Sequence, residues 1–190
     1  MRKVKLQMQV SLDGFVAGLN GEQDWMCWDW DDTLNQYVDG LLNSADALLI
    51  GRKTYEGMAS YWPAAAANPE ASAEKVAFAS RMNTIEKVIF SNTLTTADWT
   101  NARVAQNNLI DEVAALKQQV GEDLIIYGGA GIVSAFIQHN LIDEYHLFVN
   151  PVALGTGLPI WPTDKAPIFL RLIKTTVSSS GIVILCYVPA

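Results

Sequence analysis

The sequence "LLIGRKTYE", residues 48 to 56, places two cationic side chains directly behind a short apolar run. Gly51 ends this run, and three polar residues follow where the pattern becomes helical, namely Arg52, Lys53 and Thr54. A helix N-terminus exposes unpaired N–H groups and the positive end of its dipole, and neighbouring cations and hydroxyls add donors for a phosphate. The segment therefore predicts either a phosphate site or a glycine turn with two solvated cations.

A second strand-to-helix junction lies in "DLIIYGGAGIVSAFI", residues 123 to 137, where four small residues at 128–131 separate the two patterns. Either this turn is too tight for side chains, or another molecule comes close to the backbone. The spacing matches neither GxGxxG nor GxxxxGK[ST], so neither of those fingerprints is met. Two such junctions in one open α/β sheet favour a bound anion, because ligands of these sheets lie outside the carboxyl ends of the strands.

Composition favours one ordered globular domain over residues 1–190. Half of the residues are hydrophobic and 17% are charged, which is typical of a folded chain. The net charge of −7 argues against nucleic acid or an anionic membrane as a partner, since both attract basic faces. Cys27 and Cys186 form no CxxC pair, so neither a disulfide framework nor a metal site is expected. The opening residues lack the apolar core of a signal peptide, and the expected location is the cytoplasm.

Hydrophobic periodicity predicts strands that alternate with helices and end in a hairpin. The predicted strands are 3–10, 47–51, 87–91, 123–127 and 144–152, and a hairpin over 168–188 turns at "SSSG". The predicted helices run from about Asp31, from Thr54 to Trp62, from Leu109 to Val120 and up to about Gln138, the third with Asn107 or Asn108 as N-cap and Gly121 as C-cap. The stretch "PAAAANPEASAE", residues 63–74, is predicted to be a surface loop. This order implies an α/β fold with a largely parallel sheet and an antiparallel edge.

Five motifs occur in one order along nearly the whole chain: "SLDGFVAG", "IGRKTYE", "VIFS", "IYGGAGIVSAFI" and "VNPVALGTGLPIW". Together they resemble the dihydrofolate reductase-like family, and especially its branch similar to the C-terminal reductase domain of the riboflavin biosynthesis protein RibD. The resemblance implies a three-layer α/β/α fold with a mostly parallel central sheet and an antiparallel C-terminal hairpin. It also implies a cytoplasmic homodimer.

The resemblance further implies NADPH as the cofactor. The segment with Arg52, Lys53 and Thr54 would hold the 2′-phosphate and its neighbouring phosphate, and residues 128–132 would hold the pyrophosphate and approach the nicotinamide. Members of the family often have a cis peptide bond between two such glycines, here Gly128 and Gly129. The implied cofactor-binding set is Val10, Gly14, Ala17, Gly51, Arg52, Lys53, Thr54, Ser91, Asn92, Tyr127, Gly128, Gly129, Ala130, Gly131 and Ile132.

The substrate side is predicted to include Asp13, Asp31, Asn35 and Tyr55. Folate reducers of this fold place a carboxylate where this chain has Asn35, although Asp31, four residues earlier, could share that helix face. Asp31 could equally be an N-terminal helix acid favoured by the dipole. Tyr55 and the tryptophans of residues 25–30 could wall a planar heterocycle or serve packing alone.

Three functions stay open. The first is an NADPH-dependent reductase of the 5-amino-6-(5-phosphoribosylamino)uracil reductase type, acting on a small heterocycle in riboflavin biosynthesis. The second is a dihydrofolate reductase, and the third is an NADPH-binding protein without turnover. Hydride transfer is a reaction of the cofactor that the protein serves by positioning, so no catalytic triad and no metal are expected.

Overall fold

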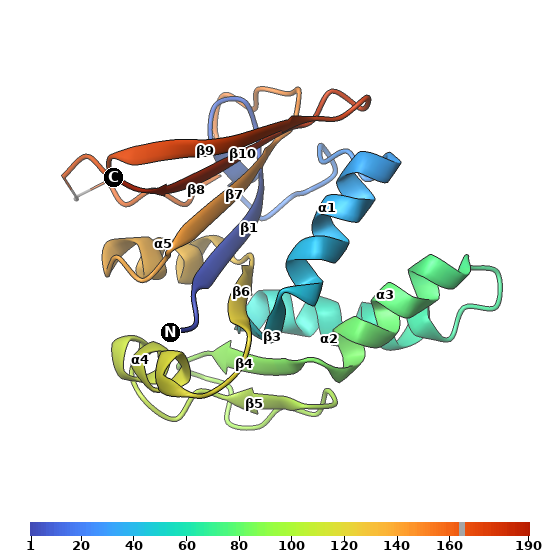
Figure 1. Ribbon diagram of the computed structural model, residues 1–190, viewed down its shortest axis with the longest axis vertical. Coiled ribbons are helices and arrows are strands. Elements are labelled where there is room, and N and C mark those ends of the chain that lie inside the picture. The colour runs from blue at the N-terminus through green and yellow to red at the C-terminus, as the bar shows by residue number, and fades with distance from the viewer. Residues whose placement is uncertain (164–165) are drawn as a thin grey trace.

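The computed structural model describes residues 1–163 and 166–190, which build a sheet in the strand order β5-β4-β3-β6-β1-β7-β10-β9 (Figure 1). The strands from β5 to β7 pair in parallel, and β10 and β9 add an antiparallel edge. A small separate sheet joins β2 to β8. This arrangement confirms the predicted mostly parallel sheet with its C-terminal hairpin. The bounds are β1 Val4–Val10, β2 Phe15–Ala17, β3 Ala45–Gly51, β4 Glu86–Phe90, β5 Ala102–Val104, β6 Asp123–Tyr127, β7 Glu144–Val149, β8 Leu158–Pro159, β9 Leu170–Val177 and β10 Val183–Pro189.

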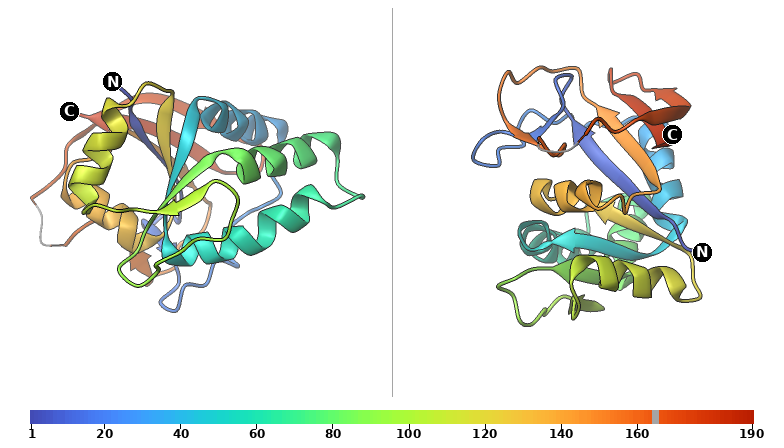
Figure 2. Two further views of the ribbon diagram at one scale, coloured as in Figure 1. Left: turned by 90° about the horizontal axis from the view of Figure 1, so that it is seen from below. Right: turned by 90° about the vertical axis from the view of Figure 1, so that its left-hand side faces the viewer.

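Helices cover both faces of the sheet, as the left view of Figure 2 shows. Alternate strand residues such as Leu48 and Ile50 pack on the side of α1 and α3, whereas Leu49 and Ile126 pack on the side of α4 and α5. The predicted three-layer α/β/α arrangement is therefore confirmed. None of the helices in the described part of the chain is long and apolar enough to cross a membrane. The bounds are α1 Asp32–Asn43, α2 Arg52–Ala66, α3 Ala73–Thr84, α4 Leu109–Gln118 and α5 Ala130–Gln138.

The prediction of a surface loop over residues 63–74 is wrong at both ends. Helix α2 continues through Pro63 to Ala66, and α3 begins at Ala73. Alanine has the highest helix propensity, so the alanine run extends α2 once its first turns exist. Helix α3 has a weak apolar pattern because its buried residues are only Ala79 and Met82, which explains why periodicity did not indicate it.

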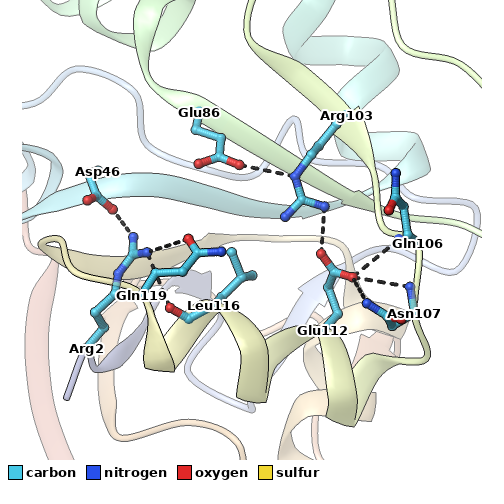
Figure 3. Close-up of polar contacts among 9 residues, drawn as sticks. All are labelled: Arg2, Asp46, Glu86, Arg103, Gln106, Asn107, Glu112, Leu116 and Gln119. Atoms are coloured by element: carbon cyan, nitrogen blue, oxygen red, sulfur yellow. Dashed lines mark hydrogen bonds and ion pairs between the residues drawn. The ribbon is translucent and has the colours of Figure 1, made fainter.

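The C-terminus of α4 is capped by a side chain from the other end of the sequence. Figure 3 shows that Arg2 donates to the carbonyl oxygen of Leu116 at 3.3 Å and forms an ion pair with Asp46. Arg2 also donates to the carbonyl oxygen of Glu122. The predicted cap at Gly121 is therefore wrong, since the helix ends at Gln118 with Gln119 as its C-cap, and the carbonyl of Leu116 faces a guanidinium. At the other end Asn108 is the N-cap, as one of the two predicted alternatives, and accepts from Asp111 N at 3.0 Å.

Lys87 is fully buried in β4 without a carboxylate partner in the described residues. Its ammonium donates to the carbonyl oxygens of Asn83 at 2.6 Å and Thr100 at 2.8 Å, and lies 4.2 Å from the centre of the Trp99 ring. Burial lowers the pKa of Lys87 to about 8. The folded protein therefore releases this proton at a lower pH than the unfolded chain does.

Replacing Lys87 by Met should remove a pH dependence of stability. Because the folded-state pKa lies below the unfolded one, the unfolded chain binds more protons between the two values, and the free energy of unfolding rises with pH there. Between about pH 7.5 and about pH 9.5, wild type should gain about 1–2 kcal/mol relative to Lys87→Met in urea unfolding. Lys75→Met, at an exposed position of α3, is the matched control and should keep a constant offset from wild type. A constant offset for Lys87→Met as well would contradict the prediction.

Candidate active site

The carboxyl ends of four neighbouring parallel strands, β4, β3, β6 and β1, meet at one edge of the sheet. Gly51 ends β3, Ser91 follows β4, and Gly128 follows β6. The strand order therefore brings the predicted phosphate residues 51–54, the residues 91–92 and the glycine junction 128–132 to one edge. Ligands of open α/β sheets bind at this edge.

The two glycine junctions are in direct contact with each other. A Cβ atom added to Gly129 would lie 3.2 Å from Thr54 Oγ1 and 3.1 Å from Ile132 Cγ2, and one added to Gly51 would lie 3.2 Å from the same Ile132 carbon. Gly128 and Gly129 have φ angles of 75° and 88°, a region that side chains disfavour. The positive φ angle of residue 129 and the nearby side chains of Thr54 and Ile132 therefore both require glycine at this position. The bond between Gly128 and Gly129 is trans, unlike the cis bond that members of the resembled family often have there.

The helices that begin at this edge have N-termini without side-chain caps. Gly51 caps α2 and Gly129 caps α5, and neither helix has an acidic residue in its first turn. The other helices of the described chain are capped by side chains, those of Asp31, Ser72 and Asn108, and each has an acid in its first turn. The first N–H groups of α2 and α5 can therefore be satisfied by an anion at the sheet edge.

Two cations stand at the start of α2. Arg52 is 42% exposed and forms an ion pair with Glu56 one turn later, with 2.8 Å between Nη1 and Oε1. Lys53 is exposed and forms no ion pair with any described residue. An exposed pair at this spacing contributes little stability, so the Arg52 guanidinium can turn to a phosphate at little cost. Nearby, Ser91 Oγ accepts from Leu94 N at 2.9 Å, and Asn92 is exposed.

Two predicted substrate carboxylates are occupied by donors from their own chain. Asp13 accepts from Ser11 Oγ at 2.6 Å and from Gly155 N at 2.7 Å, and these bonds lower the pKa of Asp13 to about 2. Asp31 accepts from Leu34 N at 3.0 Å as the N-cap of α1 and from Ser178 Oγ at 2.8 Å, which lowers the pKa of its carboxyl. Both acids therefore anchor loops around the site in their ionised form.

The remaining predicted residues surround the same edge with different exposure. Asn35 is exposed and donates to Trp30 O at 3.2 Å, and Tyr55 is buried with its hydroxyl accepting from Asp98 N at 3.0 Å. Val10 and Ala17 are buried, and Gly14 forms the turn after β1 with a φ of 86°. Asp31 is thus an acid at a helix N-terminus and Tyr55 is a buried packing residue, which are the structural alternatives to a role in substrate binding.

Gln7 and Gln9 are buried polar residues next to this edge that the sequence reasoning missed. They alternate with apolar residues in "KVKLQMQV", and strict alternation by itself indicates a half-buried strand with a polar side that faces solvent. The available signal was the position of the strand: a strand that begins a parallel α/β sheet is normally covered on both faces. Both side chains are in fact 8% exposed.

Comparison with known proteins supports one class, the reductase domains of dihydrofolate reductase-like fold. The model of the RibD C-terminal domain family matches residues 2–184. The protein YyaP of Bacillus subtilis (strain 168), itself uncharacterized, is 35% identical over 186 residues, 98% of this chain and 94% of YyaP. The riboflavin biosynthesis protein RibD of Corynebacterium ammoniagenes is 27% identical over 83% of this chain and 45% of RibD.

A solved structure of a putative riboflavin biosynthesis protein from Shewanella sp. PV-4 shares this fold, with a TM-score of 0.73 and 22% identity. That comparison covers 100% of this chain and 99% of the Shewanella chain. The family match over nearly the whole sequence identifies the chain: it belongs to the RibD C-terminal domain family.

Replacing Gly129 by Ala should destabilise the protein by about 1–3 kcal/mol, because the added Cβ meets Thr54 and Ile132 and the backbone conformation is strained for alanine. Gly131→Ala is the matched control two residues further on. Gly131 lies in α5 with open space at its Cβ, so alanine should leave stability unchanged or raise it by up to about 1 kcal/mol. Urea unfolding measures both, and equal effects would contradict the contact.

Proposed function

We propose that this chain is an NADPH-dependent reductase that transfers hydride to a small heterocyclic substrate, of the 5-amino-6-(5-phosphoribosylamino)uracil reductase type. One observation carries the proposal. In a chain that belongs to a reductase-domain family, the uncapped N-termini of α2 and α5 lie together at the carboxyl edge of the sheet, beside Arg52 and Lys53. This arrangement suits a carrier with more than one phosphate group.

The residues at this edge have separate roles in the proposal. Arg52, Lys53 and Thr54 hold the 2′-phosphate that distinguishes NADPH from NADH, and Ser91 and Asn92 border the adenosine. Residues 128–132 hold the pyrophosphate with backbone N–H groups. The cofactor supplies the hydride when bound. The protein keeps donor and acceptor in contact and excludes water.

The dihydrofolate reductase alternative is weaker. Folate reducers of this fold place a free carboxylate on the helix that corresponds to α1, whereas this chain has Asn35 at that position. Asp31 cannot replace that acid without losing bonds to Leu34, Ser178 and Ser179, which already satisfy its oxygens. An NADPH-binding protein without turnover remains the alternative from another class.

We also propose that the protein is a cytoplasmic homodimer. Strand β9 forms the outer edge of the sheet, and its side chains Leu172, Ile173 and Val177 are exposed. An exposed apolar edge strand is a surface that a second copy can cover.

The proposed reaction is tested by following NADPH oxidation at about pH 7.5 with 5-amino-6-(5-phosphoribosylamino)uracil and 7,8-dihydrofolate in parallel. Oxidation with the pyrimidine alone supports the first function, and oxidation with dihydrofolate alone would replace it by the second. NADPH binding in a fluorescence titration without any oxidation would favour a binding protein.

Arg52→Ala should weaken NADPH binding by about tenfold or more while NADH changes by about twofold or less, because only NADPH carries the 2′-phosphate that the guanidinium would hold. Fluorescence titration with each nucleotide measures both dissociation constants. Lys75→Ala, which removes an exposed cation on α3, is the matched control and should behave as wild type. Equal weakening of both nucleotides by Arg52→Ala would refute the role of Arg52.

A further inference from the structure

The central strand β1 has a polar face although helices cover the sheet on both sides. Toward α4 and α5 it presents apolar side chains, Val4, Leu6, Met8 and Val10, which belong to the core. Toward α1 it presents Lys5, Gln7 and Gln9, which share this face with Tyr127 and Phe148 on the neighbouring strands. Strands covered on both faces are normally apolar throughout, so the two buried amides need a physical reason.

Three buried polar atoms on this face have no hydrogen-bond partner in residues 1–163 and 166–190: Gln7 Oε1, Gln9 Nε2 and Tyr127 Oη. Gln7 and Tyr127 are aligned on adjacent strands, and Gln9 lies one pleat nearer the carboxyl edge. The only other such atom in those residues, Trp62 Nε1, belongs to α2. Native proteins rarely leave buried polar groups unpaired. Three together therefore indicate that something outside the chain pairs with them.

The orientation of the Gln9 amide is fixed by its neighbour Asn150. Asn150 Oδ1 accepts from Cys27 N at 3.1 Å, so its Nδ2 must be the donor, and this atom donates to Phe148 O at 3.1 Å and to Gln9 Oε1 at 2.6 Å. Asn150 is fully buried. Gln9 Oε1 is thereby the acceptor, and Gln9 Nε2 is a buried donor without a partner in the described residues.

The unpaired groups lie beside the glycine junction and a flat apolar wall. Tyr127, which carries one of the unpaired groups, directly precedes Gly128. Phe148, aligned with Gln9, stacks on Trp30 with ring centres 6.2 Å apart. Aromatic side chains together with a few polar groups are typical of sites for planar ligands.

We propose that Gln9, together with Gln7 and Tyr127, selects the heterocycle of the substrate, an inference that rests on the proposed reductase function. Gln9 Nε2 donates to a ring carbonyl oxygen, Gln7 Oε1 accepts from a ring N–H, and the Tyr127 hydroxyl can do either. The edge of a cyclic amide offers a carbonyl and an N–H side by side. These groups fit the uracil ring of the proposed substrate, and the three residues determine specificity without taking part in hydride transfer.

The test compares Gln9→Met and Tyr127→Phe, which keep side-chain shape and remove the polar groups, with Gln118→Met, an exposed control at the end of α4. Calorimetry measures binding of 5,6-diaminouracil with and without saturating NADPH, and fluorescence measures NADPH alone. Each site variant should weaken the uracil by about tenfold or more. The NADPH affinity of Gln9→Met should change by about twofold or less, and the melting temperature of Tyr127→Phe should stay level or rise, since an unpaired hydroxyl is lost.

Two results would overturn the inference: wild type that does not bind the uracil, or site variants that bind it as wild type does. In the second case the groups hold ordered water only, and a fall in the melting temperature of Tyr127→Phe would accompany it. The proposed function fails separately, when wild type binds no NADPH. Uracil binding that Gln9→Met and Tyr127→Phe weaken would then still support this recognition site.

Discussion

The close approach of two helix N-termini is the constraint on which the candidate site depends. Helices α2 and α5 start from strands β3 and β6, which are neighbours in the sheet, so their first turns meet at the same edge. They can meet only because the chain has glycine at 51 and 129, where a Cβ would press on Ile132 or Thr54. Glycine at these two positions is thus required by the protein itself, and the resulting pair of uncapped N-termini is what an anion can use.

The acids around this edge complete the arrangement by holding loops rather than a ligand. Asp13 ties the turn after β1 to residues 154 and 155, and Asp31 ties the start of α1 to the hairpin between β9 and β10. Each carboxylate therefore joins segments that are more than a hundred residues apart. Because both are satisfied as anions, they add negative charge beside the site without competing for the cations at 52 and 53. The chain is acidic as a whole, but the groups that can bind a phosphate, which are the two cations and the uncapped N-termini of α2 and α5, lie together at one edge of the sheet.

Sequence patterns predict where most strands lie along the chain and that they pair mainly in parallel, because apolar runs alternate with segments of helical periodicity. They did not predict the cap of α4, since Arg2 reaches it from a distant part of the chain. They also missed α3, whose buried face is only two residues wide. The sequence indicates both glycine junctions. It does not indicate whether glycine is needed to make room for a ligand or for side chains such as Thr54 and Ile132, because those contacts form only in the folded protein.

The buried polar side chains of this protein are of two kinds: some are fully paired within the fold, and others keep an unpaired group. We assign the first kind a structural role and the second a role in ligand recognition. Lys87 is as deeply buried as any core residue, yet two carbonyl oxygens and a tryptophan ring receive its ammonium group, so it is complete within the fold. In Gln9 only one end of the amide is paired: Asn150 donates to its oxygen, and its buried nitrogen has no partner in the described residues. A fold under selection for stability alone would place an apolar residue at such a position, as it does on the other face of β1. The retained amide is therefore best explained by an acceptor that arrives with a ligand at the carboxyl edge.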